Sequence, residues 1–118
     1  MHLCGNVRQW LVCGIGGRKD TRIRQIEFDE KGPIPNEKLI ADLESVMAEV
    51  EEVLSEIQPE DLLAIRSVQG LFTESGNSIL VHVVEHFSYH VGQITWQTKL
   101  LKNIDVGYYA EMNLDGHG

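Results

Sequence analysis

The segment His82-Val-Val-Glu-His86-Phe-Ser-Tyr-His90-Val-Gly-Gln93 carries three histidines that recur every fourth residue. Residues four apart in an α-helix lie on one face, so this spacing places the three imidazoles in a row along a helix. Apolar residues keep the same period, at Ile79, Val83, Ile94 and Leu101. The pattern predicts a long helix over residues 77–103 whose histidine face looks toward a core.

Two interpretations fit a row of inward-facing imidazoles. Histidine is the commonest side-chain ligand of metal ions, and two histidines one helical turn apart can bind one divalent ion. Alternatively, the three are core residues whose ring nitrogens are hydrogen-bonded. Because a His-x-x-x-His pair has many chance matches, the helix by itself leaves both interpretations open.

The length and charge of the chain restrict the class of protein. A chain of 118 residues fits one domain over residues 1–118. Ten Lys and Arg against 18 Asp and Glu give a net charge of -8, which argues against a nucleic-acid-binding protein. No apolar run reaches membrane-spanning length, and no signal peptide follows Met1. We expect a cytoplasmic protein in which Cys4 and Cys13 are small buried residues.

The first part of the chain predicts a helix followed by a long connection. Leu3, Val7 and Trp10 recur at helical spacing, so a helix begins at or before the first residue and ends at the glycines of residues 14–17. Residues 18–35 are polar and form a connection. Within it, three charged residues either edge a pocket or lie in a solvated loop, the simpler interpretation: Arg22, Arg24 and Glu27.

The middle of the chain predicts an amphipathic helix that ends at Ile57. Asn36 is a suitable N-cap, and apolar residues then recur three and four apart, with acidic residues on the opposite, solvated face. Residues 58–60 stop this helix, and residues 62–72 are either extended or a turn of helix.

A metal site of the catalytic kind usually has three protein ligands and an open position. Outside the histidine helix and the tail, His2 is the only candidate for the third ligand. Antiparallel packing of the first helix against the histidine helix would bring His2 to their common end. His117, between two glycines, is given no role.

Three motifs occur along the chain in a recognisable order: His2-Leu-x-Gly5-Asn6, Arg22-x-Arg24-x-x-Glu27-Phe28 and His86-Phe-Ser-Tyr-His90-Val-Gly92-Gln93-Ile94. Together they resemble the DinB-like metalloprotein superfamily, the damage-inducible helical bundles related to YfiT. The resemblance covers nearly all of the chain. It implies an all-α, up-down-down-up four-helix bundle with a long crossover between its second and third helices, here the connection from Gly14 to Pro35.

The same resemblance implies a ligand set. The metal triad of the family maps onto His2, His86 and His90, and the implied ion is divalent, zinc or nickel. His82 then lies one turn outside, as a pocket residue or a partner of a ligand. Asn6 and Gln93 are also placed where they can face the pocket, although either can instead bond backbone or water.

The first helix of the family has no counterpart before His2, so the expected bundle lacks one helix. Either the start of the chain is placed late or that helix is absent. A bundle without it exposes an apolar groove larger than a monomer tolerates, so we expect a homodimer in which a second copy covers the groove.

Two classes of function follow. The first is a metal-dependent enzyme, a thiol S-transferase or a hydrolase, in which the ion lowers the pKa of a bound thiol or water. Glu85 is next to His86 but points elsewhere on the helix, so no general base is assigned. The second class is a non-catalytic metal-binding or dimeric interaction protein. Its site is either structural, with His82 or the amino terminus as a fourth ligand, or vestigial. A further alternative is a truncated paralogue whose histidines are only core residues.

Overall fold

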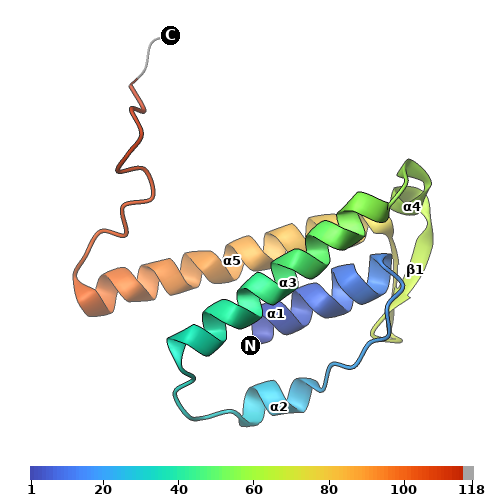
Figure 1. Ribbon diagram of the computed structural model, residues 1–118, viewed down its shortest axis with the longest axis horizontal. Coiled ribbons are helices and arrows are strands. Elements are labelled where there is room, and N and C mark those ends of the chain that lie inside the picture. The colour runs from blue at the N-terminus through green and yellow to red at the C-terminus, as the bar shows by residue number, and fades with distance from the viewer. Residues whose placement is uncertain (116–118) are drawn as a thin grey trace. The chain divides into compact units, whose positions relative to one another are not determined.

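The computed structural model describes residues 1–115 and forms two compact units, Met1–Phe87 and the part of the chain from Ser88 onward. Most of the described residues are helical (Figure 1), as the sequence predicts. The fold is not purely α-helical, because it also contains a small two-stranded sheet. Among the described residues, no helix combines the length and the apolar character needed to cross a membrane. His117 lies outside the described residues.

The chain begins with α1 (His2–Val7), which continues as η1 (Arg8–Ile15), a wider π-helix. The N–H of Gly16 donates to the carbonyl of Leu11 at 3.1 Å, the five-residue spacing of a π-helix. Gly17 then adopts a φ of 67°, in the left-handed region that favours glycine. The helix therefore ends at the glycines, as predicted, but with a wider last part than the α-helical spacing indicates.

The helix α3 (Asn36–Glu56) runs parallel to α1 and η1 (Figure 1). Arg8 donates to Asp42 at 2.7 Å, and further along both helices a Cβ on Gly16 would lie 2.7 Å from a methyl group of Val53. The connection between these parallel helices must therefore return along their length, as expected of a crossover. It contains the short helix α2 (Arg24–Asp29). The N-cap prediction is wrong by one residue, since Pro35 holds that position.

The segment between the two long helices contains both helix and strand. The helix α4 (Pro59–Leu63) precedes an antiparallel hairpin of β1 (Ile65–Val68) and β2 (Phe72–Ser75). Pro59 stands in the first turn of α4, where its missing N–H is tolerated. The two interpretations of residues 62–72 are therefore both realised, one after the other.

The histidine helix is α5 (Gly76–Lys102), within one residue of the predicted range at each end. Its first half, in the first unit, buries Ile79 and Val83. The rings of Trp10 and His82 stack at 3.9 Å, and His2 contacts His86, so α1 and η1 run antiparallel to this half of α5. The contact with His2 falls within α5 and not at its end.

Burial differs sharply between the two units. The core residues come from α1, η1, α3, β1 and the first half of α5: Cys4, Val7, Trp10, Leu11, Val12, Ile15, Val46, Val53, Val68, Ile79 and Val83. Among residues 88–115, none is buried, and Ile94 and Leu101 are 57% and 71% exposed. The prediction that these two face a core is wrong within this chain, because a helical period shows which face is apolar but not what covers it.

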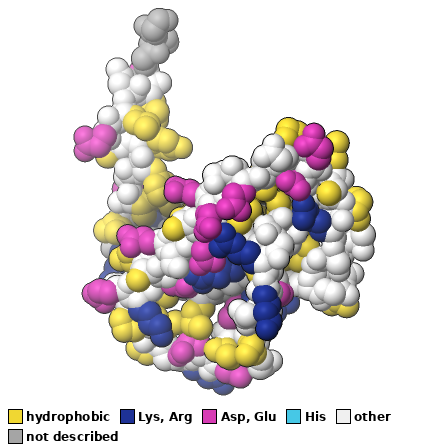
Figure 2. Space-filling model, turned by 45° about the vertical axis from the view of Figure 1, so that its right-hand side comes forward, with side chains coloured by type: hydrophobic (Ala, Val, Ile, Leu, Met, Phe, Trp, Pro, Cys, Tyr) yellow, Lys and Arg dark blue, Asp and Glu magenta, His cyan; other side chains and the backbone are white. Residues whose placement is uncertain are grey.

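The predicted apolar face of α3 is also only partly covered. Val46 and Val53 are buried, whereas five large apolar side chains of the same helix are exposed: Leu39, Ile40, Leu43, Met47 and Leu54. On the face in Figure 2, acidic and basic side chains lie beside one another with apolar side chains between them. Three of the ion pairs between such side chains are Arg8–Asp42, Arg18–Glu52 and Arg66–Asp61.

Candidate metal centre

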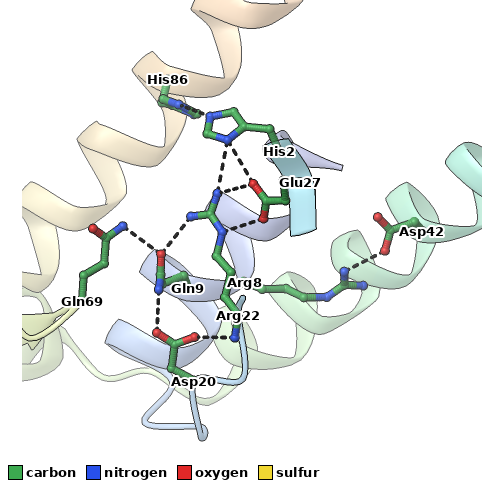
Figure 3. A network of polar contacts seen from close by, with 9 residues as sticks. All are labelled: His2, Arg8, Gln9, Asp20, Arg22, Glu27, Asp42, Gln69 and His86. Atoms are coloured by element: carbon green, nitrogen blue, oxygen red, sulfur yellow. Dashed lines mark hydrogen bonds and ion pairs between the residues drawn. The ribbon is translucent and has the colours of Figure 1, made fainter. Parts of the chain in front are cut away.

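Two of the predicted ligands meet across the packed helices. Nε2 of His2, in the first turn of α1, lies 3.1 Å from Nε2 of His86 on α5 (Figure 3). Neutral imidazoles can share one hydrogen bond at this distance. It is also close to the spacing of two nitrogens that each lie about 2.0–2.1 Å from one zinc ion. The first turn holds His2 in place, because the N–H of Gly5 donates to the carbonyl of Met1 at 2.9 Å.

Asn6 and His82 lie in the same pocket as this pair, a space of about 210 Å³ between α1, η1, the hairpin and α5. The remaining lining residues are Trp10, Arg22, Arg24, Gln69 and Phe72. The ring of His82 stacks on that of Trp10. It also stacks on His86, one turn further along α5, with 5.7 Å between ring centres. Within residues 1–115, neither Nε2 of His82 nor Oδ1 of Asn6 has a hydrogen-bond partner.

Behind His2 lies a buried ion pair. Arg22 donates to both oxygens of Glu27, at 2.7 and 2.8 Å, and these side chains are only 6% and 10% exposed. The hydrogen bonds from Arg22 hold the pKa of Glu27 below its usual value, and the neighbouring His2 acts in the same direction. The interpretation of Arg22 and Glu27 as solvated loop residues is therefore wrong, and Arg22 lines the pocket.

Gly5 makes room for this ion pair. A Cβ at residue 5 would lie 2.3 Å from Oε1 of Glu27 and 2.9 Å from Nε of Arg22. A glycine inside a helix is unfavourable by itself, so its place here has a packing reason. A glycine at residue 5, inside a predicted helix, is the sequence signal that a neighbouring group packs closely there. Only the folded chain identifies that group as the Arg22–Glu27 pair.

A network of amides extends from the ion pair to the hairpin. Oε1 of Gln9 accepts from Arg22 and from Gln69, each at 2.8 Å, and the amide of Gln9 donates to Asp20 at 2.7 Å (Figure 3). Gln69, at the hairpin turn, has a φ of 57°, which is uncommon for a residue with a side chain. The network joins η1, the crossover and the hairpin at one edge of the pocket.

The other predicted residues lie on the part of α5 that belongs to the second unit. His90 follows His86 by one turn of an unbroken helix, so the two histidines share a face of α5. Its ring packs edge-on against Tyr89. Gln93 is exposed and donates to the hydroxyl of Tyr89 at 3.1 Å.

The remaining candidate groups do not belong to the pocket. Cys4 is buried, and burial, followed by its hydrogen bond to Asp42, raises the pKa of its thiol. Burial also raises the pKa of Cys13, whose thiol donates to the carbonyl of Lys19. Glu85 is exposed and does not line the pocket, as expected for the residue next to His86.

The fold and this site define a mainly helical domain in which histidines of two antiparallel helices meet beside a buried ion pair. The chain belongs to the family DUF1572, described as a protein of unknown function, whose model matches residues 1–109. No curated protein and no solved structure matches the chain.

Proposed function

We propose that this chain is a DinB-like metal-binding domain in which His2, His86 and His90 hold one divalent ion, zinc or nickel. The observation that carries the proposal is the 3.1 Å approach of the Nε2 atoms of His2 and His86. His90 adds a third imidazole one turn along the same helix, and these three histidines are a group that could hold an ion. Imidazole nitrogen suits both metals.

The motifs of the sequence and the arrangement of the helices support the DinB-like assignment. In that family, a ligand from the second helix joins two ligands from the fourth. Here α1 with η1 stands in the place of the second helix, α3 in that of the third and α5 in that of the fourth. The parallel course of α1 and α3 agrees with the up-down-down-up order of such a bundle.

The chemistry proposed for the site is activation of a small nucleophile. A divalent ion lowers the pKa of a bound thiol or water molecule, which favours an S-transferase or a hydrolase. Three protein ligands leave a position open for such a molecule, whereas structural zinc is closed by four. The chain itself supplies the three neutral imidazoles, the buried Arg22–Glu27 pair beside His2, and a pocket wall of Trp10 and Phe72.

Metal analysis of the untagged protein, purified without chelators, tests the proposal. We expect about one zinc or nickel ion per chain, lost in His86→Ala and in His90→Ala. His117→Ala, a histidine outside the described residues, is the matched control and should retain the ion. Protein that contains no metal, and takes up none on addition of zinc or nickel, would refute the site.

A panel of low-molecular-weight thiols with an electrophilic substrate tests the enzymatic part of the proposal. We expect consumption of the electrophile that stops when the ion is removed and resumes when it is restored. Turnover that is unchanged in the metal-free protein would exclude this mechanism. A metal-loaded protein without turnover would support a non-catalytic metal site instead.

A dimeric interaction protein is the second candidate function, and the exposed apolar faces favour it. Residues 88–102 carry Lys99 and Lys102 and no acidic residue. Their large apolar side chains are exposed: Tyr89, Ile94, Trp96, Leu100 and Leu101. The helix with this exposed apolar face, α3, also carries exposed acidic residues that form no ion pair with a residue of the described part of the chain: Glu37, Glu44, Glu51 and Glu56. We propose a homodimer in which residues 88–102 of each copy cover α3 of the other, since the two faces complement each other in charge.

Light scattering coupled to size-exclusion chromatography tests this arrangement. At micromolar concentration the protein should have twice the mass of one chain, and Trp96→Glu should have the mass of one chain. Phe28→Glu, at an exposed aromatic residue of α2, should remain dimeric. A wild-type protein with the mass of one chain would refute the dimer.

A further inference from the structure

The ring of His2 has two neighbours of opposite kind at Nδ1, the nitrogen that does not contact His86. Nδ1 lies 3.3 Å from a carboxylate oxygen of Glu27 and 3.2 Å from a guanidinium nitrogen of Arg22 (Figure 3). A carboxylate can only accept a hydrogen bond, and a guanidinium can only donate one. The pair can therefore satisfy Nδ1 whether or not that nitrogen carries a proton.

The two neutral tautomers of His2 use these neighbours in different ways. When the proton is on Nε2, that group can donate to Nε2 of His86, and Nδ1 accepts from Arg22. When the proton is on Nδ1, it is donated to Glu27, and Nε2 presents a lone pair. Only the second tautomer can bind a metal ion through Nε2, and metal-binding histidines usually donate their other N–H to such an acceptor.

We infer that Glu27 and Arg22 are a positioning pair for His2, which holds the imidazole in one orientation in both tautomers. The histidine can then take up and release an ion while Nδ1 keeps a hydrogen-bond partner in either tautomer. The inference rests on the proposed metal site and adds to it two residues that touch neither the ion nor the substrate. Glu27 is the acceptor, and Arg22 keeps the carboxylate in place.

The surroundings of the pair favour this role over that of a surface ion pair. Both side chains are almost fully buried and joined by two short hydrogen bonds, so their geometry is well defined. The third nitrogen of the Arg22 guanidinium donates a hydrogen bond to Oε1 of Gln9. Gly5 lets the pair lie directly against α1, one turn from His2 on the same helix.

Zinc titration of the metal-free protein against a chromogenic chelator is the first test. We expect Glu27→Gln to weaken zinc binding by about 10- to 100-fold, the usual effect of losing such a partner. The matched control is Glu49→Gln on α3, which removes a carboxylate that accepts a hydrogen bond from Arg8. This variant should bind zinc like the wild type. Circular dichroism of both variants establishes that they are folded.

Nitrogen-15 NMR of the histidine rings is a readout that a purely structural role would not change. In the zinc-loaded wild type, His2 should carry its proton on Nδ1, and a hydrogen bond to a carboxylate should shift that proton downfield. In zinc-loaded Glu27→Gln the downfield shift should disappear. Glu27→Asp, which retains the carboxylate, should recover part of the zinc affinity.

A second variant moves the pair without changing its chemistry. Gly5→Ala places a Cβ against both Glu27 and Arg22, so zinc affinity should fall although alanine favours the helix. Gly32→Ala, in the connection, is the matched glycine control, because within residues 1–115 its Cβ meets one flexible side chain, that of Glu30, at 3.4 Å. Binding in both Glu27→Gln and Gly5→Ala within twofold of wild type would overturn the inference.

These outcomes are distinct from failure of the proposed function. If the wild type binds no zinc, or if His86→Ala binds it as well as the wild type, the metal site itself is wrong. If zinc binding needs His86 but is unaffected by the changes at Glu27 and Gly5, the metal site stands and the positioning role is refuted.

Discussion

Trp10 is the side chain that joins the core to the histidine pocket. It is 6% exposed, its ring stacks on His82 at 3.9 Å, and it also packs against Phe72. Trp10→Ala should therefore leave a cavity and lower the free energy of unfolding by about 3–5 kcal/mol. Urea unfolding of the metal-free protein measures the change. Phe28→Ala, at an exposed aromatic side chain, should stay within about 0.5 kcal/mol of wild type.

A loss below about 1 kcal/mol in Trp10→Ala would contradict this packing. The sequence predicts Trp10 on the apolar face of the first helix from its spacing alone. Its stacking on His82 could not be predicted, because it depends on how two helices that are far apart in the chain face each other. The same reason explains why Arg22 and Glu27 look like loop residues in the sequence and are buried in the fold.

The contact between η1 and α3 has a charged edge that depends on pH. Burial acts to raise the pKa of Asp42, but the hydrogen bonds from Arg8 and Cys4 outweigh it and lower that pKa below its usual value. A lowered pKa stabilises the folded state above the unfolded pKa, about 4, and the contribution is lost as the pH falls through the folded pKa.

Asp42→Asn should therefore be less stable than wild type at pH 7, and the difference should shrink as the pH falls below about 4. The urea midpoint at several pH values measures it. Glu44→Gln, an exposed residue of the same helix, should follow the wild type. A difference between Asp42→Asn and wild type that is the same at all pH values would contradict the assignment.

Two glycines of α5 should respond in opposite ways to substitution by alanine. A Cβ at Gly92 has no atom within 4 Å among the described residues, so Gly92→Ala should stabilise the isolated chain by about 1 kcal/mol. At Gly76 a Cβ would lie 2.2 Å from the carbonyl oxygen of Asp61, so Gly76→Ala should destabilise it. Urea unfolding at concentrations where the protein is monomeric compares the two. A destabilised Gly92→Ala would mean that another segment occupies that space.

At the scale of the whole molecule, burial is confined to the first unit. Every buried apolar side chain of the described residues lies between Cys4 and Val83. Amides of η1, α3 and the first half of α5 should therefore exchange with deuterium most slowly in dilute protein, and those of residues 88–102 faster. If the dimer forms as proposed, residues 88–102 should become more protected as the concentration rises, and Trp96→Glu should abolish that increase. Equal protection of both halves of α5 at every concentration would contradict this distribution.

The positions of the three long helices follow from the sequence alone, because helical periods and glycine or proline signals act within a few residues. The short helices α2 and α4 lie in segments that the sequence predicts as a connection and a helix stop. The same local pattern puts His82, His86 and His90 in one row, and His2 is the only other histidine outside this helix and the tail. The hairpin had weaker signals, since a short apolar segment of this length is compatible with helix or strand.

Only the tertiary structure decided which groups meet. His2 reaches His86 across 84 positions because α1 packs antiparallel to α5, and the crossover returns Arg22 and Glu27 to the space that Gly5 leaves open. The tertiary structure also decided that apolar side chains of α5 are buried in its first half and exposed in its second. The physical reason is range: a period in the sequence reports the face that a helix turns inward, whereas the partner on that face depends on the packing of distant segments.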